Sequence, residues 1–342
     1  MSSVTEHPTA ADTASAGQSE NWLRSVLSNQ HVLLVVALAI LVAYFTARDS
    51  IFVSSPEIAV LLTNLASLIL LATGETFVII SGGIDLSVGA TSGFCGVVAA
   101  FVMRDMINAN TNEALVLIVG TLICAGIGIG VGLLNAALMN WARLVPFVAT
   151  LATLGAGTGM ALVLSNGVPI GDDSSALTLG ADHIGPFPYL FLVVLAVVVI
   201  AWLYLHLSGF GRYTYAIGSN SFAARAAGIN VRRHLTAVYA LSGLMAGLTG
   251  MVFYIRLGAG APSSGDGFEL TAIASVVIGG VSLFGGSGRL TGSVLGALIL
   301  TVVTSGLIIS NVSPNWNQVA VALCIAAAAS LQALRLTNRR KS

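Results

Sequence analysis

Long apolar segments follow one another along this chain, with almost no charged residues inside them. A helix needs about 20 apolar residues to cross the ~30 Å hydrocarbon layer of a bilayer, where it satisfies its own backbone groups in the absence of water. Charged residues make up 8% of the chain, against roughly 25% in soluble domains. The sequence therefore predicts an all-α fold, a polytopic bundle of transmembrane helices.

The apolar segments define about ten membrane spans, within a transmembrane domain at 31–334. Residues 1–30 are rich in Ser, Thr, Ala and acidic side chains, which predicts a disordered tail, and residues 335–342 form a basic C-terminus. The predicted spans are 31–47, 57–80, 86–103, 114–139, 145–164, 189–207, 235–256, 268–284, 290–310 and 317–334.

The basic residues predict how the bundle is oriented. Cytoplasmic loops of membrane proteins carry an excess of Lys and Arg. If both termini are cytoplasmic, all 14 basic residues face the cytoplasm except Arg48, Arg104 and Arg256. We therefore predict that both termini, with the tail 1–30 and the C-terminus 335–342, lie in the cytoplasm.

Glycine is frequent, with 38 residues in the chain, and small residues let helices approach closely in lipid. Two glycine-rich segments look alike, Val78–Gly89 and Val276–Ser287. Each ends one predicted span and is followed by another that is rich in small residues. The likeness is compatible with an old internal duplication and equally with chance.

Placing an ionisable group at membrane depth costs free energy unless the group is paired or in contact with water, so such groups are candidates for function. Asp85 either lines or gates a solute path, or caps the helix predicted to start at Leu86, and the two roles are compatible. Glu75 and Glu269 either belong to that path or are satisfied by neighbouring helices. The candidate translocation path or gate comprises Glu75, Ser81, Gly82, Gly83, Asp85, Ser87, Asn135, Glu269, Gly279 and Gly280.

Three asparagines, Asn64, Asn135 and Asn311, are neutral hydrogen-bonding groups in or beside the predicted spans. They can bond to the hydroxyl groups of a solute or join helices to one another. We favour helix joining, although Asn135 stays within the candidate path.

Motifs for catalysis or metal binding are weak or missing. A phosphate-binding loop needs a Gly-Lys-Ser/Thr ending, and the only lysine is Lys341, so any ATPase is a separate chain. Gly285-Gly-Ser-Gly288 fits a serine-protease pattern only loosely, because it lies in a glycine-rich turn. The three cysteines lie in apolar runs without metal-ligand spacing. We predict no catalytic residue and no metal site.

The hydrophilic segment 208–234 contains a predicted short helix. Asn220 or Ser219 is a suitable N-cap, an Ala-rich stretch with high helix propensity follows, and Gly228 stands where a C-terminal cap belongs. A helix of two turns is too short to span a membrane, and it is unstable in water unless it packs on something.

The apolar side chains of this short helix indicate what it packs on. Phe222 and Ile229 favour docking into a groove of another protein. The alternative is a helix that lies on the lipid headgroups.

Three blocks of sequence resemble the ribose, xylose and galactose type of permease from bacterial ABC importers. The resemblance extends from about Asn64 to Leu334, and Thr271, Ala227 and Val281 depart from the aspartate, serine and threonine that are common in the family. The blocks are Gly74-Glu-Thr-Phe-Val-Ile-Ile-Ser-Gly-Gly-Ile-Asp-Leu-Ser-Val-Gly89, Ala216-Ile-Gly-Ser-Asn-Ser-Phe-Ala-Ala-Arg-Ala-Ala-Gly-Ile229 and Phe268-Glu-Leu-Thr-Ala-Ile-Ala-Ser-Val-Val-Ile-Gly-Gly-Val-Ser-Leu-Phe-Gly-Gly-Ser-Gly288, with the weaker Val145-Pro-Phe-Val-Ala-Thr-Leu151.

The resemblance implies a membrane-spanning permease subunit of an ATP-driven ABC importer, a multi-pass protein of the bacterial cytoplasmic (inner) membrane. It would form the translocation path for a monosaccharide or similar polyol. The implied partners are an ABC ATPase subunit that binds ATP and Mg²⁺, a periplasmic or lipid-anchored sugar-binding protein, a second permease subunit and the lipid bilayer, with no nucleic acid and no cofactor on this chain.

The resemblance also assigns a role to the loop 208–234, which corresponds to the coupling loop of the family. Its short helix would rest on the ATPase. The implied ATPase-coupling residues are Asn220, Ser221, Phe222, Ala223, Ala224, Arg225, Ala227, Gly228 and Ile229.

Two other classes of transporter stay open at this point. A secondary transporter driven by an ion gradient has the same kind of composition, and Glu75 and Asp85 would then carry protons or sodium. The branched-chain amino acid permeases of ABC importers share the general plan of the sugar permeases, so the class of solute is less secure than the role of the subunit.

Overall fold

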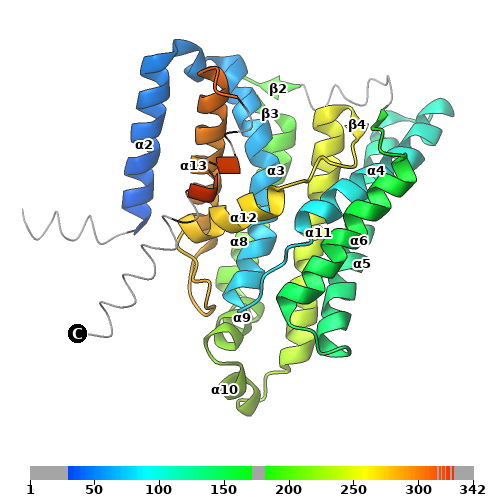
Figure 1. Cartoon of the computed structure of the whole chain (residues 1–342), viewed down its shortest axis with the longest axis vertical. Helices are drawn as coiled ribbons and strands as arrows, with labels where there is room; N and C mark the ends of the chain where they lie inside the picture. Colours follow the sequence, from blue (N-terminus) through cyan, green and yellow to red (C-terminus); the bar gives the residue numbers. More distant parts are fainter. Residues whose placement is uncertain are drawn as a thin grey trace, which may run out of the picture.

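A computed structural model describes residues 30–171, 182–313 and isolated positions between 316 and 326 (Figure 1). The predicted tail 1–30 except Gln30, most of the predicted span 317–334 and the C-terminus 335–342 lie outside the described residues.

The described part is almost entirely helical, which confirms the predicted all-α bundle. Its 8 helices that are long and apolar enough to cross a membrane match 8 of the predicted spans to within a few residues. They are α2 (Gln30–Arg48), α3 (Ser55–Ile80), α4 (Val88–Asn108), α5 (Glu113–Asn140), α6 (Pro146–Ser165), α8 (Tyr189–Leu207), α11 (Val231–Leu257) and α13 (Leu290–Ile309).

Shorter elements connect these helices. The helical ones are η1 (Ser50–Val53), α9 (Gly209–Ser219), α10 (Ser221–Ala226) and α12 (Phe268–Ile278). Two antiparallel pairs of two-residue strands complete the described elements: β1 (Ile170–Gly171) with β4 (Ala259–Gly260), and β2 (His183–Ile184) with β3 (Phe187–Pro188).

The prediction of a full span at 268–284 was wrong. The helix there, α12, has 11 residues, and at 1.5 Å per residue it is only about half as long as the hydrocarbon layer is thick. It stops because Gly279 and Gly280 follow it, and Gly280 has a left-handed backbone with φ of 89°. The apolar residues beyond these glycines belong to a turn, although their composition resembles that of a span.

The centre of the bundle is formed by α3 and α11. Every residue of α3 from Leu65 to Ile80 is buried, and α11 packs against α3, α4 and α5. The contact between α5 and α11 is made through glycines, since a side chain on Gly128 would collide with the backbone at Gly243. At one edge of the bundle α2 packs on α13 and η1, while α4, α5 and α6 lie on the other side (Figure 1).

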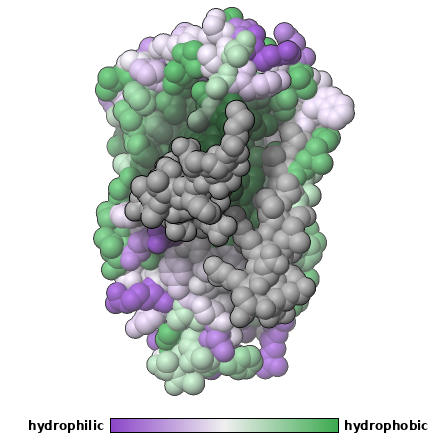
Figure 2. Space-filling view, turned by 90° about the vertical axis from the view of Figure 1, so that its left-hand side faces the viewer, coloured by the Kyte–Doolittle hydropathy of each residue, from purple (hydrophilic) through white to green (hydrophobic). Residues whose placement is uncertain are grey.

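The two ends of the bundle differ in charge. The end that carries α10 also holds the turn between α5 and α6 and the first residues of α11 (Figure 1). Where coloured residues are visible in the middle of the face shown in Figure 2, most are hydrophobic, and hydrophilic residues gather above and below them. Among the described arginines, those at the α10 end are Arg143, Arg212, Arg225, Arg232, Arg233 and Arg289.

Arg48, Arg104 and Arg256 lie at the opposite end, where α2, α4 and α11 finish. This grouping is the one that the sequence predicts for a cytoplasmic α10 end. The assignment of that end to the cytoplasm stays a prediction that follows from the positive-inside rule.

Candidate functional site

The loop between α3 and α4 places Asp85 in the interior of the bundle, where its side chain is buried. One carboxylate oxygen, Oδ1, accepts hydrogen bonds from the backbone N–H of Ser87 at 3.0 Å and from its hydroxyl at 2.6 Å. The other, Oδ2, accepts from the Ser242 hydroxyl of α11 at 2.9 Å. Asp85 therefore ties its loop to a neighbouring helix.

The network continues through Ser87 to two more helices. Asn135 of α5 donates from its side-chain amide to the Ser87 hydroxyl at 2.8 Å. Thr153 of α6 donates to the Asn135 carbonyl oxygen at 2.6 Å. Asn135 thus joins helices, as favoured from the sequence. Each of these buried polar groups has a partner, as a stable polar network requires.

The structure bears on one of the two roles proposed for Asp85, that of a helix cap. The helix α4 begins at Val88 rather than at Leu86, and its N-cap Ser87 makes no side-chain capping bond. Asp85 satisfies the backbone of Ser87 just before the helix and also anchors the loop to α11. Its role in a solute path stays a prediction.

Glu75 lies on α3 and is fully buried. Neither of its carboxylate oxygens has a hydrogen-bond partner among the described residues. An ionisable group in this position is costly in a membrane. Glu269 lies apart from it, in the first turn of α12, with its carboxylate against Gly89 of α4.

Two of the remaining candidate path residues, Ser81 and Gly279, are the C-caps of helices. Ser81 follows the last residue of α3 and donates from its hydroxyl to the Val78 carbonyl at 2.7 Å. Gly279 ends α12 and packs directly on Gly292 of α13. The structure therefore brings Glu75, Asp85, Ser87 and Asn135 together, whereas Glu269, Gly279 and Gly280 lie at the two ends of α12.

The two glycine-rich segments meet each other beside the end of α9. Gly286 donates from its backbone N–H to the carbonyl of Ile80, the last residue of α3, at 2.8 Å. Gly285 lies against Gly82, and the backbone of Gly218 in α9 lies directly on the Ile80 carbonyl, so that a side chain there would collide with it. We call these contacts, made by residues 80–83, 218–219 and 285–288, the three-loop junction.

Hydrogen bonds from α9 hold this junction together. Tyr215 donates from its hydroxyl to the Gly288 carbonyl at 2.8 Å, and Ser219 donates to the Gly286 carbonyl at 3.5 Å. Only one residue, Asn220, separates the end of α9 from the start of α10. The junction therefore links α10 to the loop that carries Asp85 through a continuous series of backbone contacts.

The short helix α10 forms as the sequence predicts. Asn220 is its N-cap and accepts hydrogen bonds from the N–H groups of Phe222 and Ala223, each at 3.0 Å. Gly228 follows the helix with a φ of 88°. Phe222 is 84% exposed, whereas Ile229 packs against a small cluster around Ala224. The expected outward role of Ile229 is thus not seen, and Phe222 is the apolar group that α10 presents.

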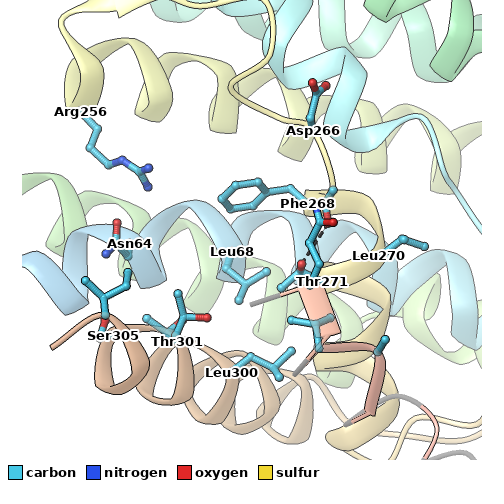
Figure 3. A pocket seen from close by; sticks show the side chains of 16 residues that line it. Asn64, Leu68, Arg256, Asp266, Phe268, Leu270, Thr271, Leu300, Thr301 and Ser305 are labelled. Atoms are coloured by element: carbon cyan, nitrogen blue, oxygen red, sulfur yellow. Dashed lines mark hydrogen bonds between the residues drawn. The ribbon is translucent and has the colours of Figure 1, made fainter. Parts of the chain in front are cut away.

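Two cavities lie toward the opposite end of the bundle. The first lies between α3, α11, α12 and α13 (Figure 3), and the second lies between α3, the end of α11 and the strands β2 and β3. The first has a volume of about 520 Å³ and the second of about 680 Å³. Both are lined by Asn64 and Arg256, and the first also by Phe268, Thr301 and Ser305. None of the ten candidate path residues predicted from the sequence lines either cavity.

Sequence reasoning missed several residues of these sites, among them Ser242, Thr153, Arg256 and Ser305. Each is a polar residue within an apolar or small-residue stretch. Arg256 carried a signal, since it is one of three basic residues predicted to lie at the exterior. The serines and threonines carried none, because their partners lie on helices distant in the sequence.

Comparison with known proteins identifies the family. A family model described as the permease component of branched-chain amino acid transport systems matches residues 57–329. The ribose import permease protein RbsC of Bacillus subtilis is 36% identical over 310 residues, which cover 90% of this chain and 92% of that protein.

Two further relatives come from Escherichia coli K12. The D-allose transport system permease protein AlsC is 36% identical over 301 residues, covering 87% of this chain and 90% of that protein. The ribose import permease protein RbsC is 34% identical over 299 residues, covering 85% of this chain and 90% of that protein. With its membrane-spanning helices, the chain therefore belongs to this family of ABC importer permeases, a transport component of the bacterial cytoplasmic membrane rather than an enzyme.

Proposed function

We propose that this chain forms the membrane pathway of an ATP-driven importer for a monosaccharide or similar polyol. The support is that the relatives described above, at 34–36% identity over most of both chains, are named for ribose and allose. The family model carries the name of branched-chain amino acid systems, but those individual relatives are named for sugars.

The observation that carries the coupling role is the exposure of Phe222 on α10. An aromatic side chain that is 84% exposed at the arginine-rich end of the bundle is suited to a groove on a partner protein. In our proposal the partner is an ABC ATPase subunit, and ATP and Mg²⁺ bind to that subunit.

The three-loop junction offers a route from α10 into the membrane. A displacement of α10 would move the end of α9, which contacts both the Ile80 carbonyl and the loop around Gly286. These contacts are between backbone atoms, so they leave little room for one segment to move without the others. In our proposal the loop of Asp85 and the turn after α12 shift together when the ATPase moves.

A complete importer needs further subunits. In our proposal a second permease subunit completes the pathway, and a periplasmic or lipid-anchored binding protein delivers the solute to the end that carries Arg256. The broad apolar surface between the hydrophilic ends (Figure 2) is suited to contact with lipid and with that second subunit.

A pair of matched variants tests the coupling role. Phe222→Ala should reduce both the amount of ATPase that copurifies with the permease and the rate of ATP-dependent uptake. Trp141→Ala is the control, because Trp141 is 85% exposed in the turn between α5 and α6 at the same end. If both variants or neither lost the ATPase, α10 would not be the docking helix.

The driving force has its own test. Proteoliposomes that contain the copurified complex should take up sugar only with internal ATP and external binding protein. Uptake that follows a proton or sodium gradient without ATP would refute the proposal in favour of a secondary transporter.

A further inference from the structure

The two cavities are arranged in series. Asn64 and Arg256 line both of them (Figure 3). The larger cavity reaches the end opposite α10, where Pro56, His183 and Gly258 line it. The smaller one continues inward along α12 and α13. Asn64 and Arg256 thus lie where the two cavities adjoin.

The polar groups at this passage lack partners within the described part of the chain. Asn64 makes no hydrogen bond there, and Arg256 makes no ion pair but lies over the Phe253 ring at 5.7 Å. Ser305 is only 3% exposed and its hydroxyl is likewise unbonded to any described residue. Polar side chains at membrane depth are tolerated where they are paired or face water, so these groups are suited to a hydrated passage or a polar ligand.

The chemistry of the lining is that of a site for a neutral, polyhydroxylated molecule. An amide, a guanidinium and hydroxyl groups supply both donors and acceptors. Phe268 projects between them in Figure 3, and its ring offers an apolar face to the C–H face of a sugar. The volume of about 520 Å³ lies within the roughly 300–1,000 Å³ of small-molecule sites.

A charged solute fits this lining less well. Arg256 favours an anion, but Asp266 also lines the inner cavity and would repel it. Arg256 and Asp266 form no ion pair, and they lie on either side of the Phe268 ring (Figure 3).

We propose that Asn64 and Arg256 form a recognition point for a neutral polyol, which hydrogen-bonds to the solute between the two cavities. This proposal rests on the proposed function. It adds selectivity within the membrane subunit itself, at residues outside the candidate path predicted from the sequence.

The test measures uptake by the complete importer, reconstituted with its ATPase and binding protein. D-ribose and D-allose are the labelled probes, and leucine is the comparison solute. The reference sugar is whichever of the two the unaltered importer takes up faster. For Asn64→Ala and Arg256→Gln we expect uptake of that sugar to fall about tenfold, while ATP hydrolysis stimulated by the loaded binding protein is retained. Arg104→Gln is the matched control, since Arg104 also lies at this end and over an aromatic ring, that of Phe101 at 5.5 Å.

A second measurement does not depend on uptake. Ser305→Cys should react with a small thiol reagent, and the sugar should slow that reaction in the otherwise unchanged protein but not in the Asn64→Ala background. Normal uptake in both variants, equal protection in both backgrounds, or leucine protecting better than sugar would overturn the recognition point. If the unaltered complex shows no ATP-dependent sugar uptake, the proposed function itself fails.

Discussion

The hydrogen bond from Ser242 to Asp85 should stabilise the bundle measurably. The change Ser242→Ala removes the only bond that joins the Asp85 carboxylate to α11 among the described residues, while the two bonds from Ser87 remain. Alanine fits because the serine hydroxyl is the only group removed. The loop that carries Asp85 would then be held by its local turn and by the bond between Ser87 and Asn135.

The expected cost follows from the kind of bond. Hydrogen bonds between transmembrane helices average about 0.6 kcal/mol in double-mutant cycles, whereas bonds to charged groups contribute about 1.5–3 kcal/mol. The bond is 2.9 Å long and both residues are buried. We expect Ser242→Ala to lower the free energy of unfolding by about 1–2 kcal/mol.

A buried serine of α3 provides the control. Ser67 is as fully buried as Ser242, but its hydroxyl has no partner among the described residues. Ser67→Ala should be neutral or slightly stabilising, because it removes a buried polar group that makes no bond.

The assay is reversible unfolding in mixed detergent micelles, followed by tryptophan fluorescence, with both variants measured in parallel. The difference between the two variants removes the effects that are common to any buried Ser→Ala change. If the free energies of unfolding of Ser242→Ala and Ser67→Ala agreed within about 0.3 kcal/mol, the anchoring role of Asp85 would be refuted.

Two further predictions concern glycines at close contacts. In Gly218→Ala the new methyl group would collide with the Ile80 carbonyl, so we expect a loss of about 1–3 kcal/mol in stability and slower uptake. The control is Gly155→Ala, because Gly155 has open space around it; this change should leave the melting temperature in a thermal-stability assay unchanged. Gly128→Leu should prevent recovery of folded protein in detergent, because the new side chain would separate α5 from α11. Gly126→Leu should give a normal yield of folded protein, because no atom lies near the position of its side chain. Equal yields from the two variants would contradict the close packing of α5 on α11.

The helical spans were predictable because the bilayer imposes one simple requirement on each of them. An apolar run of sufficient length predicts a helix, and α8 or α13 could be read in this way. The exception is α12, where the apolar residues continue past Gly280 and the composition conceals the break. The N-cap Asn220 and the short helix α10 were also predictable, since capping is a local property of the sequence.

The site was less predictable, because its contacts join residues far apart in the chain. Asp85 was recognisable as a buried acid, but its partner Ser242 lies 157 residues away. Asn64 was noted as a hydrogen-bonding group, and its proximity to Arg256 at the cavities depends on how α3 and α11 pack. One-dimensional patterns identify such groups singly, and only the packing of the helices pairs them.

The peripheral position of α2 bears on how the chain is inserted during synthesis. Among the described helices it leaves the ribosome first, yet its main packing partner, α13, begins only at Leu290. It must therefore be stable in lipid alone while the rest of the chain is translated, and its apolar surface, with Arg48 only in the last turn, suits that interval. The central helix α11 differs, because its packing partners α3, α4 and α5 are translated before it. Its polar and small residues can therefore pack on these helices as soon as it is inserted.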